Sequence, residues 1–175
     1  DEYIREVFTE TSNRINTMSL VHQKLYQSNN LSSIDLGEFF SELSELILSS
    51  YPEQGENVQI NRHLEPVDVT IDVAVPLGLV FNELITNIMK HAFPDGRKGN
   101  ITIELKKENN HIHMSVADDG VGFPSHELPD SSRSMGVGTI YSIVENQLHG
   151  SVEYDLENGV QWSISIRDEL YSKRV

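Results

Sequence analysis

The sequence predicts an α+β protein, a two-layer α/β sandwich with a mixed sheet and three helices, preceded by one long helix. Two observations indicate this fold class. Runs of alternating apolar residues come in sequence-adjacent pairs separated by turn residues, as the strands of β-hairpins do. Helical patterns lie between these pairs, whereas repeated strand–helix–strand units, which would indicate a parallel sheet, do not occur.

The long helix is predicted from about Glu2 to Ser28. Its apolar and small residues recur at alternating spacings of four and three, the a/d pattern of a coiled coil or helix bundle. At ~1.5 Å per residue this helix would be roughly 40 Å long, too long for a small domain to bury alone. We expect it to pack on a partner helix, from an upstream segment or a second chain, and packing on its own domain is the weaker alternative. The a/d stripe comprises Ile4, Phe8, Thr11, Ile15, Met18, His22 (expected to be packed) and Leu25.

A second helix follows a polar loop. Asp35 and Glu38 form a capping box that predicts a helix to about Ser50. Two short strands, over 58–60 and 67–71, should come next. The residues of this helix that should face inward are Leu36, Phe39, Phe40, Leu43 and Ile47.

A third helix is predicted after these strands, with Pro76 in its first turn and a Pro-Asp-Gly stretch at residues 94–96 closing it. Two hairpins with a helix between them complete the chain, and an Asn-Asn and an Asn-Gly pair supply their turns. The expected strands are 101–105, 112–117, 152–156 and 160–166, and the last helix is 139–148.

The third helix carries two stripes at helical spacing. An apolar stripe should face the core, and beside it lie Glu83, Asn87 and Lys90, because residues three and four apart share a face. A carboxylate, an amide and an amine next to a buried face could hold a metal ion and a phosphate. His91 lies at the edge of this polar stripe, and Asn82 points to the far side. The apolar stripe comprises Leu77, Phe81, Leu84, Ile85, Ile88 and Ala92.

Two glycine-bearing segments add to this candidate site. Asp118 ends a predicted strand and points the same way as the core residues, whereas Asp119 points the other way. A carboxylate aimed inward needs hydrogen-bond donors, and a nucleobase amino group is one. Gly120 and Gly122 would let the backbone approach a flat ligand closely. Further along, residues 134–139 open a helix, where backbone N–H groups can bind phosphate oxygens.

Composition argues against several classes of function. The chain has 27 acidic against 13 basic residues and a formal net charge of −14, which disfavours nucleic acid and anionic membrane surfaces as partners. It has no cysteine, which excludes disulfides and thiolate chemistry. No apolar run approaches the length of a membrane span, and no signal peptide is recognisable. Because the chain starts at Asp1 and its first methionine is Met18, we expect a fragment of a longer protein, cytoplasmic itself, whose parent can be membrane-anchored.

The motifs together are more specific than each alone. Asn87 and Lys90 on a helix, Asp118-x-Gly-x-Gly after a strand, and Gly136-x-Gly before a helix closely resemble the N, G1 and G2 boxes of the histidine-kinase, gyrase and chaperone ATPase superfamily (GHKL, Bergerat fold). The resemblance covers roughly residues 58–166. The run Asn-Glu-Leu-Ile-Thr-Asn-Ile-Met-Lys-His-Ala-Phe-Pro looks like sensor histidine kinases whose phosphoacceptor box reads His-His-Arg-Val-Lys-Asn-Asn. Residues 14–26 are similar to the second helix of the dimerisation hairpin in that subfamily.

By position, the resemblance implies a site for ATP and Mg²⁺. Asn87 would hold Mg²⁺ with support from Glu83, and Lys90 would contact phosphate. Asp118 would read the adenine amino group, and His91 would line the nucleotide. The other implied contacts are Gly120 and Gly122 on the adenine wall, and Met135, Gly136, Val137, Gly138 and Thr139 at the phosphates.

The resemblance therefore implies the ATP-binding catalytic domain (31–175) of a sensor histidine kinase with part of its dimerisation domain (1–30). Such a kinase transfers the ATP γ-phosphoryl to a histidine and then to a response regulator. Its implied partners are a second copy, through the N-terminal helix, that response regulator and an upstream sensor domain. The phosphoacceptor box is not in this sequence, so the fragment should not autophosphorylate alone.

Two alternatives stay open. An ATP hydrolase of the same superfamily would use Glu83 as the base that activates water. A non-catalytic nucleotide sensor, or pseudokinase, is suggested by Val160, which stands where the family usually has a threonine that supports the adenine-reading aspartate. Three roles of Glu83 therefore stay open: supporting ligand of the metal, base for water, or base for a histidine that this fragment lacks.

Overall fold

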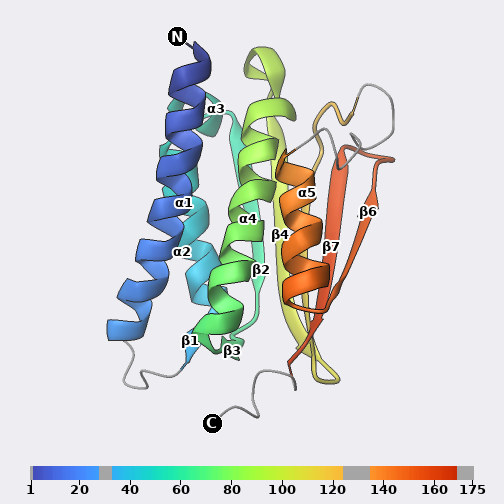
Figure 1. Cartoon of the computed structure of the whole chain (residues 1–175). Helices are drawn as coiled ribbons and strands as arrows, with labels where there is room; N and C mark the ends of the chain where they lie inside the picture. Colours follow the sequence, from blue (N-terminus) through green and yellow to red (C-terminus); the bar gives the residue numbers. More distant parts are fainter. Residues whose placement is uncertain (1, 28–32, 124–134, 169–175) are drawn as a thin grey trace.

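The computed structural model describes residues 2–27, 33–123 and 135–168. In this part of the chain, helices cover one face of a five-stranded sheet, and the N-terminal helix lies outside them (Figure 1). The helices are α1 (Glu2–Gln27), α2 (Leu36–Ser49), α3 (Pro52–Gly55), α4 (Ile71–His91) and α5 (Met135–Tyr141), which continues as a π-helical segment (Ser142–Gln147). The strands are β1 (Ile34–Asp35), β2 (Val58–Leu64), β3 (Asp68–Val69), β4 (Gly99–Glu108), β5 (His111–Asp118), β6 (Ser151–Asp155) and β7 (Val160–Arg167).

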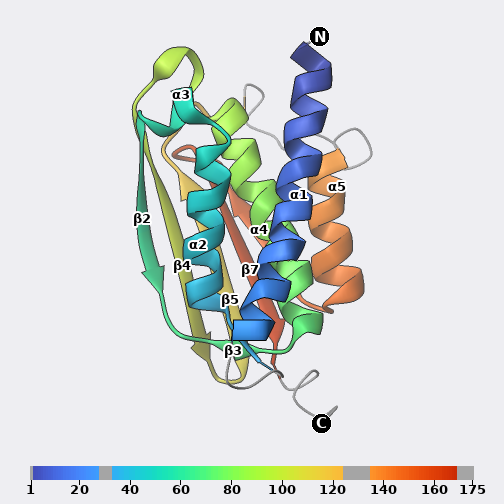
Figure 2. The same cartoon turned by 90° about the vertical axis from the view of Figure 1, so that its left-hand side faces the viewer.

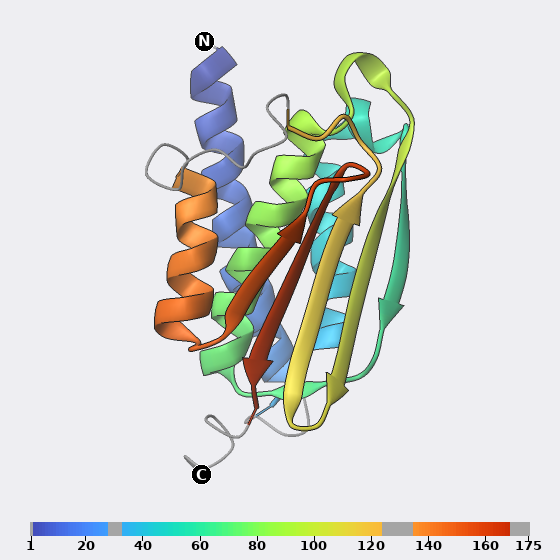
Figure 3. The same cartoon turned by 90° about the vertical axis from the view of Figure 1, so that its right-hand side faces the viewer.

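The sheet is mixed, with the strand order β2-β4-β5-β7-β6 (Figure 3). β2 runs parallel to β4, and the other neighbouring pairs are antiparallel. The hairpin turn between β4 and β5 is made by Asn109 and Asn110, both with left-handed backbone angles. A separate ladder joins β1 to β3. The predicted α+β class, the mixed sheet and both hairpins are therefore confirmed.

The core lies between the sheet and the helices α2, α4 and α5 (Figures 2 and 3). Phe40 of α2 stacks on Phe81 of α4 with the ring centroids 4.5 Å apart. Asp35 caps α2 as predicted, because its carboxylate accepts hydrogen bonds from the backbone N–H groups of Gly37 and Glu38. Every residue predicted to face inward on α2 and α4 is buried.

Helix α1 has the predicted extent but packs on its own domain, which had been the weaker alternative. Its buried face consists of Asn13, Thr17 and Val21. Thr17 lies against Gly78 of α4, and Asn13 accepts a hydrogen bond from Ser50 at the end of α2. Small polar side chains dominate this face, so a search for apolar periodicity could not identify it.

The a/d stripe of α1, predicted to be covered, is exposed in the single chain. Phe8 is 71% exposed and Ile15 is 61% exposed. His22, which was expected to be packed, is also exposed, and the side chain of Leu25 lies outside the described residues. The structure thus separates two faces of α1, one occupied by its own domain and one without a partner in the described part of this chain.

Two helices begin earlier than predicted. α4 starts at Ile71, so Pro76 lies inside the helix and not in its first turn, and the strand expected over 67–71 shortens to β3. The amide that Pro76 lacks would have bonded to the carbonyl of Asp72, an exposed residue near the start of the helix, so the proline is tolerated. α5 starts at Met135, so the predicted glycine loop forms its first turns.

The sequence was expected to hold no apolar stretch of the length of a membrane span, but helix α4 is long and apolar enough to cross a membrane by length and composition. However, 72% of its most apolar window is buried inside the protein, between the sheet on one side and α1 and α2 on the other. A helix that is covered on both sides must be apolar around most of its circumference, as a membrane-spanning helix is. This explains why α4 has the composition of a membrane span.

The loop after β5 presses against the end of α4. The backbone N–H of Val121 donates to the carbonyl oxygen of Ala92 at 2.9 Å. Gly120 makes this approach possible, because a Cβ at that position would lie 2.4 Å from the same carbonyl oxygen. The close contact fixes the end of β5 relative to the end of α4.

Replacing Gly120 with alanine should separate these two segments. We expect Gly120→Ala to lower the free energy of unfolding by about 1–3 kcal/mol, because backbone must move to admit the methyl group. Chemical denaturation measures the change. Gly55→Ala is the matched control, since the nearest atom to its added Cβ is 3.5 Å away. An equal loss in both variants would contradict this account.

Candidate functional site

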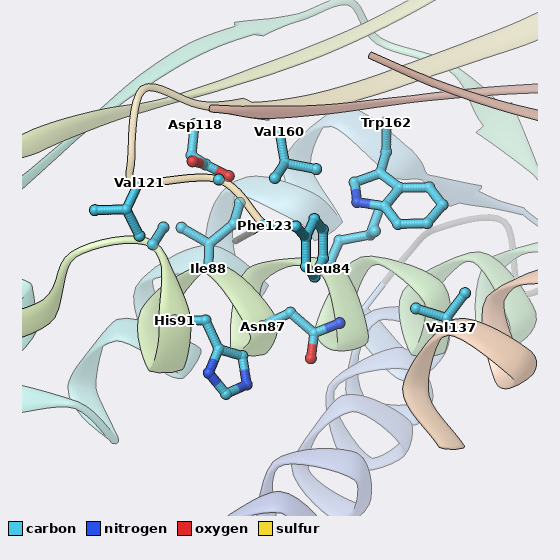
Figure 4. A pocket seen from close by; sticks show the side chains of 12 residues that line it. Leu84, Asn87, Ile88, His91, Asp118, Val121, Phe123, Val137, Val160 and Trp162 are labelled. Carbon is cyan, nitrogen blue, oxygen red and sulfur yellow. The ribbon is translucent and has the colours of Figure 1, made fainter. Parts of the chain in front are cut away.

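A cavity of about 410 Å³ lies between α4 and the ends of β5 and β7 (Figure 4). Most of its lining side chains are apolar and only a few are polar, the usual composition of a small-molecule site. The lining residues are Leu84, Asn87, Ile88, His91 and Ala92 of α4, Asp118 of β5, Val121, Gly122 and Phe123 of the following loop, Val137 of α5, and Val160 and Trp162 of β7.

Asp118 places a carboxylate in the sheet side of this cavity (Figure 4). It is 6% exposed, and its Oδ1 accepts a hydrogen bond from the backbone N–H of Gly120 at 2.9 Å. Burial raises the pKa of Asp118, and the backbone N–H groups of Gly120 and Val160 oppose this shift only in part. A carboxylate with two oxygens keeps acceptor capacity for a further donor. Asp119 points away, as predicted, and binds Asn100.

Helix α4 supplies the opposite wall. Asn87 and His91 lie one turn apart and both line the cavity, as their predicted positions require. Asn82 does not line it, but it is 1% exposed and so does not face solvent either. Gly78, one turn before Asn82, meets side chains of α1 and α2, so the far side of α4 is covered.

Glu83 and Lys90 lie on α4 beside the cavity and do not line it. Glu83 Oε1 accepts from Arg14 of α1, at 2.8 Å from Nε and 2.7 Å from Nη2. Lys90 pairs with Glu10, also of α1. The predicted polar stripe therefore divides: Asn87 faces the cavity, and its neighbours face α1.

Helix α5 brings Gly136 next to the polar residues of α4. A Cβ on Gly136 would lie 3.2 Å from Glu83 Oε2 and 3.6 Å from Asn87 Nδ2, so the glycine lets α5 pack closely against both side chains. Val137 lines the cavity, whereas Gly138 and Thr139 follow in the helix without lining it. The side chain of Met135 lies outside the described residues. Gly122 lines the cavity, and Gly120 packs on α4 next to it.

Several site residues were not identified from the sequence. Trp162 was predicted only as an alternating strand residue, and Val160 was linked to the site only through the family resemblance. The alternation of both residues opposite Asp118 on the paired strand was a signal that they share its face. Phe123 had no pattern of its own. Glu10 and Arg14 could not be found, because they belong to α1 and meet α4 only through tertiary packing.

The cavity is suited to a flat, largely apolar ligand with a hydrogen-bond donor for Asp118. Among the described residues, no cluster of three acidic or histidine side chains could hold a metal ion alone. Glu83 and Asn87 still offer one carboxylate and one amide oxygen next to Gly136. This set fits Mg²⁺, which commonly takes one or two protein ligands and completes its shell with phosphate and water.

Two family models match the chain. The first, described as histidine kinase, matches residues 1–51. The second, described as histidine kinase-, DNA gyrase B- and HSP90-like ATPase, matches residues 72–170. The second match contains α4, the cavity and both glycine segments, and it confirms the resemblance to this superfamily.

Relatives and solved structures agree with these models. The sensor histidine kinase PdtaS of Mycobacterium tuberculosis is 28% identical over 149 residues, which are 85% of this chain and 29% of PdtaS. The chain thus spans less than a third of that relative.

The histidine kinase domain of the blue-light-activated kinase EL346 from Erythrobacter litoralis superposes with a TM-score of 0.78 at 21% identity, covering 91% of this chain and 75% of that domain. The catalytic domain of histidine kinase ThkA has a TM-score of 0.64 at 19% identity, covering 78% of this chain and 96% of that domain. Both likenesses show the fold. Because the ATPase model matches more than half of the sequence, the chain belongs to the family of histidine kinase-, DNA gyrase B- and HSP90-like ATPases.

Proposed function

We propose that this chain is the ATP-binding catalytic domain of a sensor histidine kinase, with one helix of its dimerisation domain attached. The observation that carries the proposal is the buried carboxylate of Asp118 in an apolar cavity whose other wall holds Asn87 and His91. The two family models, one for each part of the chain, support the same assignment.

In this proposal adenine occupies the apolar part of the cavity. Asp118 accepts a hydrogen bond from the adenine amino group, and Val160 and Trp162 contact the ring from the sheet side. Gly120 and Gly122 shape the wall behind the base, and His91 lines the nucleotide from α4. Val160 has no hydroxyl to offer Asp118, but its backbone N–H already donates to that carboxylate. For this reason we favour a competent nucleotide site over a pseudokinase.

The phosphates lie toward the corner formed by Glu83, Asn87 and Gly136. Asn87 would hold Mg²⁺ with Glu83 in support, and Lys90 and residues 135–139 would contact the phosphates. When bound, Mg²⁺ neutralises charge on the phosphate oxygens, the main contribution that phosphoryl transfer requires. The side chains of this chain position the substrate and supply no covalent intermediate.

The proposed reaction joins two segments of a longer protein. The bond between the γ-phosphorus and the bridging oxygen of ATP breaks, a phosphorus–nitrogen bond forms on a histidine outside this sequence, and ADP leaves. A response regulator then receives the phosphoryl group in the cytoplasm, under the control of an upstream sensor domain. The exposed stripe of α1, which includes Phe8 and Ile15, is the proposed contact for the rest of the dimerisation hairpin and for a second copy.

Asp118→Asn tests the adenine contact. Asparagine has one oxygen, so its amino group must face either the backbone donors or the amino group of the base, and one donor is left unpaired. We expect the affinity for Mg-ATP, measured by calorimetry, to fall about tenfold or more.

The thermal stability of Asp118→Asn is its internal control. Burial raises the pKa of Asp118, so the folded state loses stability as the pH rises from the pKa of the unfolded chain through the raised pKa of the folded protein. The neutral amide avoids this cost at pH 7. The melting temperature should therefore be maintained or raised. Unchanged ATP affinity would contradict the proposed orientation of the base.

The kinase assignment is tested by a longer chain that restores the upstream segment. With ATP labelled at the γ-phosphate, we expect a protein-bound label that is lost in acid and stable in base, as phosphohistidine is. Release of labelled inorganic phosphate without labelled protein would favour the ATP hydrolase. If neither occurs while Mg-ATP still binds, the kinase assignment fails.

A further inference from the structure

Helix α1 contacts the polar stripe of α4 through charged side chains of both signs. The two helices run antiparallel (Figure 2). Along them, Glu10 lies at Lys90, Arg14 at Glu83 and Thr17 at Gly78. The two ion pairs involve the two members of the stripe that do not line the cavity. Helix α1 therefore covers the part of the site proposed to meet phosphate.

The pair between Arg14 and Glu83 is held at short range. Both Nε and Nη2 of Arg14 approach Glu83 Oε1, at 2.8 and 2.7 Å, and the Glu83 side chain is 10% exposed. Glu83 Oε2 lies next to Gly136 of α5. The same carboxylate thus contacts α1 with one oxygen and the nucleotide corner with the other.

The second ion pair joins Glu10 to Lys90, the cationic residue of the polar stripe. The Lys90 side chain is 11% exposed and that of Glu10 is 33% exposed, so the pair is partly shielded from water and from salt. A carboxylate and a phosphate oxygen present the same charge to the ammonium group. With Glu10 in place, Lys90 must exchange partners before it can contact a phosphate fully.

The rest of the interface is poorly suited to permanent packing. Among the described residues, Asn13 Nδ2 on the buried face of α1 has no hydrogen-bond partner, and neither do two buried polar atoms of α4, Asn82 Oδ1 and Thr86 Oγ1. Each such group costs free energy that exposure to water would recover. The face that α1 itself buries consists of two small polar residues, Asn13 and Thr17, and one apolar residue, Val21. Both features lower the free-energy cost of opening this interface.

We propose that α1 and the phosphates of the bound nucleotide compete for the polar stripe of α4. In the docked state, Glu10 pairs with Lys90 and Arg14 pairs with Glu83. Binding of Mg-ATP draws Lys90 to the phosphates and Glu83 to the metal, and the two ion pairs that fix α1 to α4 weaken. Because coupling is reciprocal, docking of α1 weakens ATP binding by the same factor. This inference rests on the proposed ATP site. It adds that the dimerisation helix senses whether the site is filled.

Glu10→Gln tests the competition, because it removes the charge that opposes phosphate without touching the cavity. We expect this variant to bind Mg-ATP about three- to tenfold more tightly than the unaltered protein, the effect of releasing one partly buried ion pair. Calorimetry measures both affinities. Adenosine, which has no phosphate, should bind the two proteins equally.

Glu42→Gln is the matched control. Glu42 belongs to α2 and pairs with Lys24 near the other end of α1, and Lys24 keeps Glu38 of α2 as a second partner. This variant therefore removes the same charge away from the site while α1 stays docked. Its affinity for Mg-ATP should equal that of the unaltered protein. If Glu42→Gln tightens ATP binding as much as Glu10→Gln does, the effect is one of net charge, and the proposal is wrong.

Hydrogen exchange provides the reciprocal measurement. Mg-ATP should speed amide exchange in α1 of the unaltered protein, whereas adenosine should leave it unchanged. Equal ATP affinity in Glu10→Gln and the unaltered protein, or slower exchange of α1 with ATP, would overturn the competition while leaving the ATP site in place. Failure of every variant to bind Mg-ATP would instead remove the proposed function itself.

Discussion

The structure depends on one helix that is buried on both sides and still has to present polar groups to a ligand. Helix α4 packs on the sheet through Leu84 and Ile88 and on α2 through Phe81, so its rotation about its own axis is fixed by the core. That fixed rotation decides which polar residues meet the cavity and which meet α1. A helix held by one face only would leave the same side chains in less defined positions.

Opposite this helix, the sheet contributes a single carboxylate to the cavity. Asp118 reaches the cavity because β5 ends there, with its register set by both neighbouring strands. Gly120 then lets the chain turn tightly against the end of α4, so that the carboxylate and the amide of Asn87 belong to one cavity. The relative positions of these polar groups are fixed by the packing of two rigid elements, α4 and β5.

Local patterns predicted much of this arrangement. The helix capped by Asp35, the hairpins, the stripe of α4 and the inward direction of Asp118 all follow from periods of 3.6 and 2 and from turn residues. The early start of α4 was missed because Pro76 suggested a first turn. The docking of α1 was missed because its buried face is polar, and no local rule connects Arg14 with a glutamate 69 positions away. Tertiary contacts between charged side chains have no periodic signature.

The central claim, that ATP binds in the cavity between α4 and the sheet, can be tested with the single tryptophan of the chain. Trp162 lines that cavity, so its fluorescence should be transferred to an ATP analogue carrying an N-methylanthraniloyl group. In the presence of Mg²⁺ we predict transfer that saturates with the analogue and is reversed by excess unlabelled ATP. If the analogue binds without transfer from Trp162, or if unlabelled ATP does not displace it, the nucleotide does not occupy this cavity.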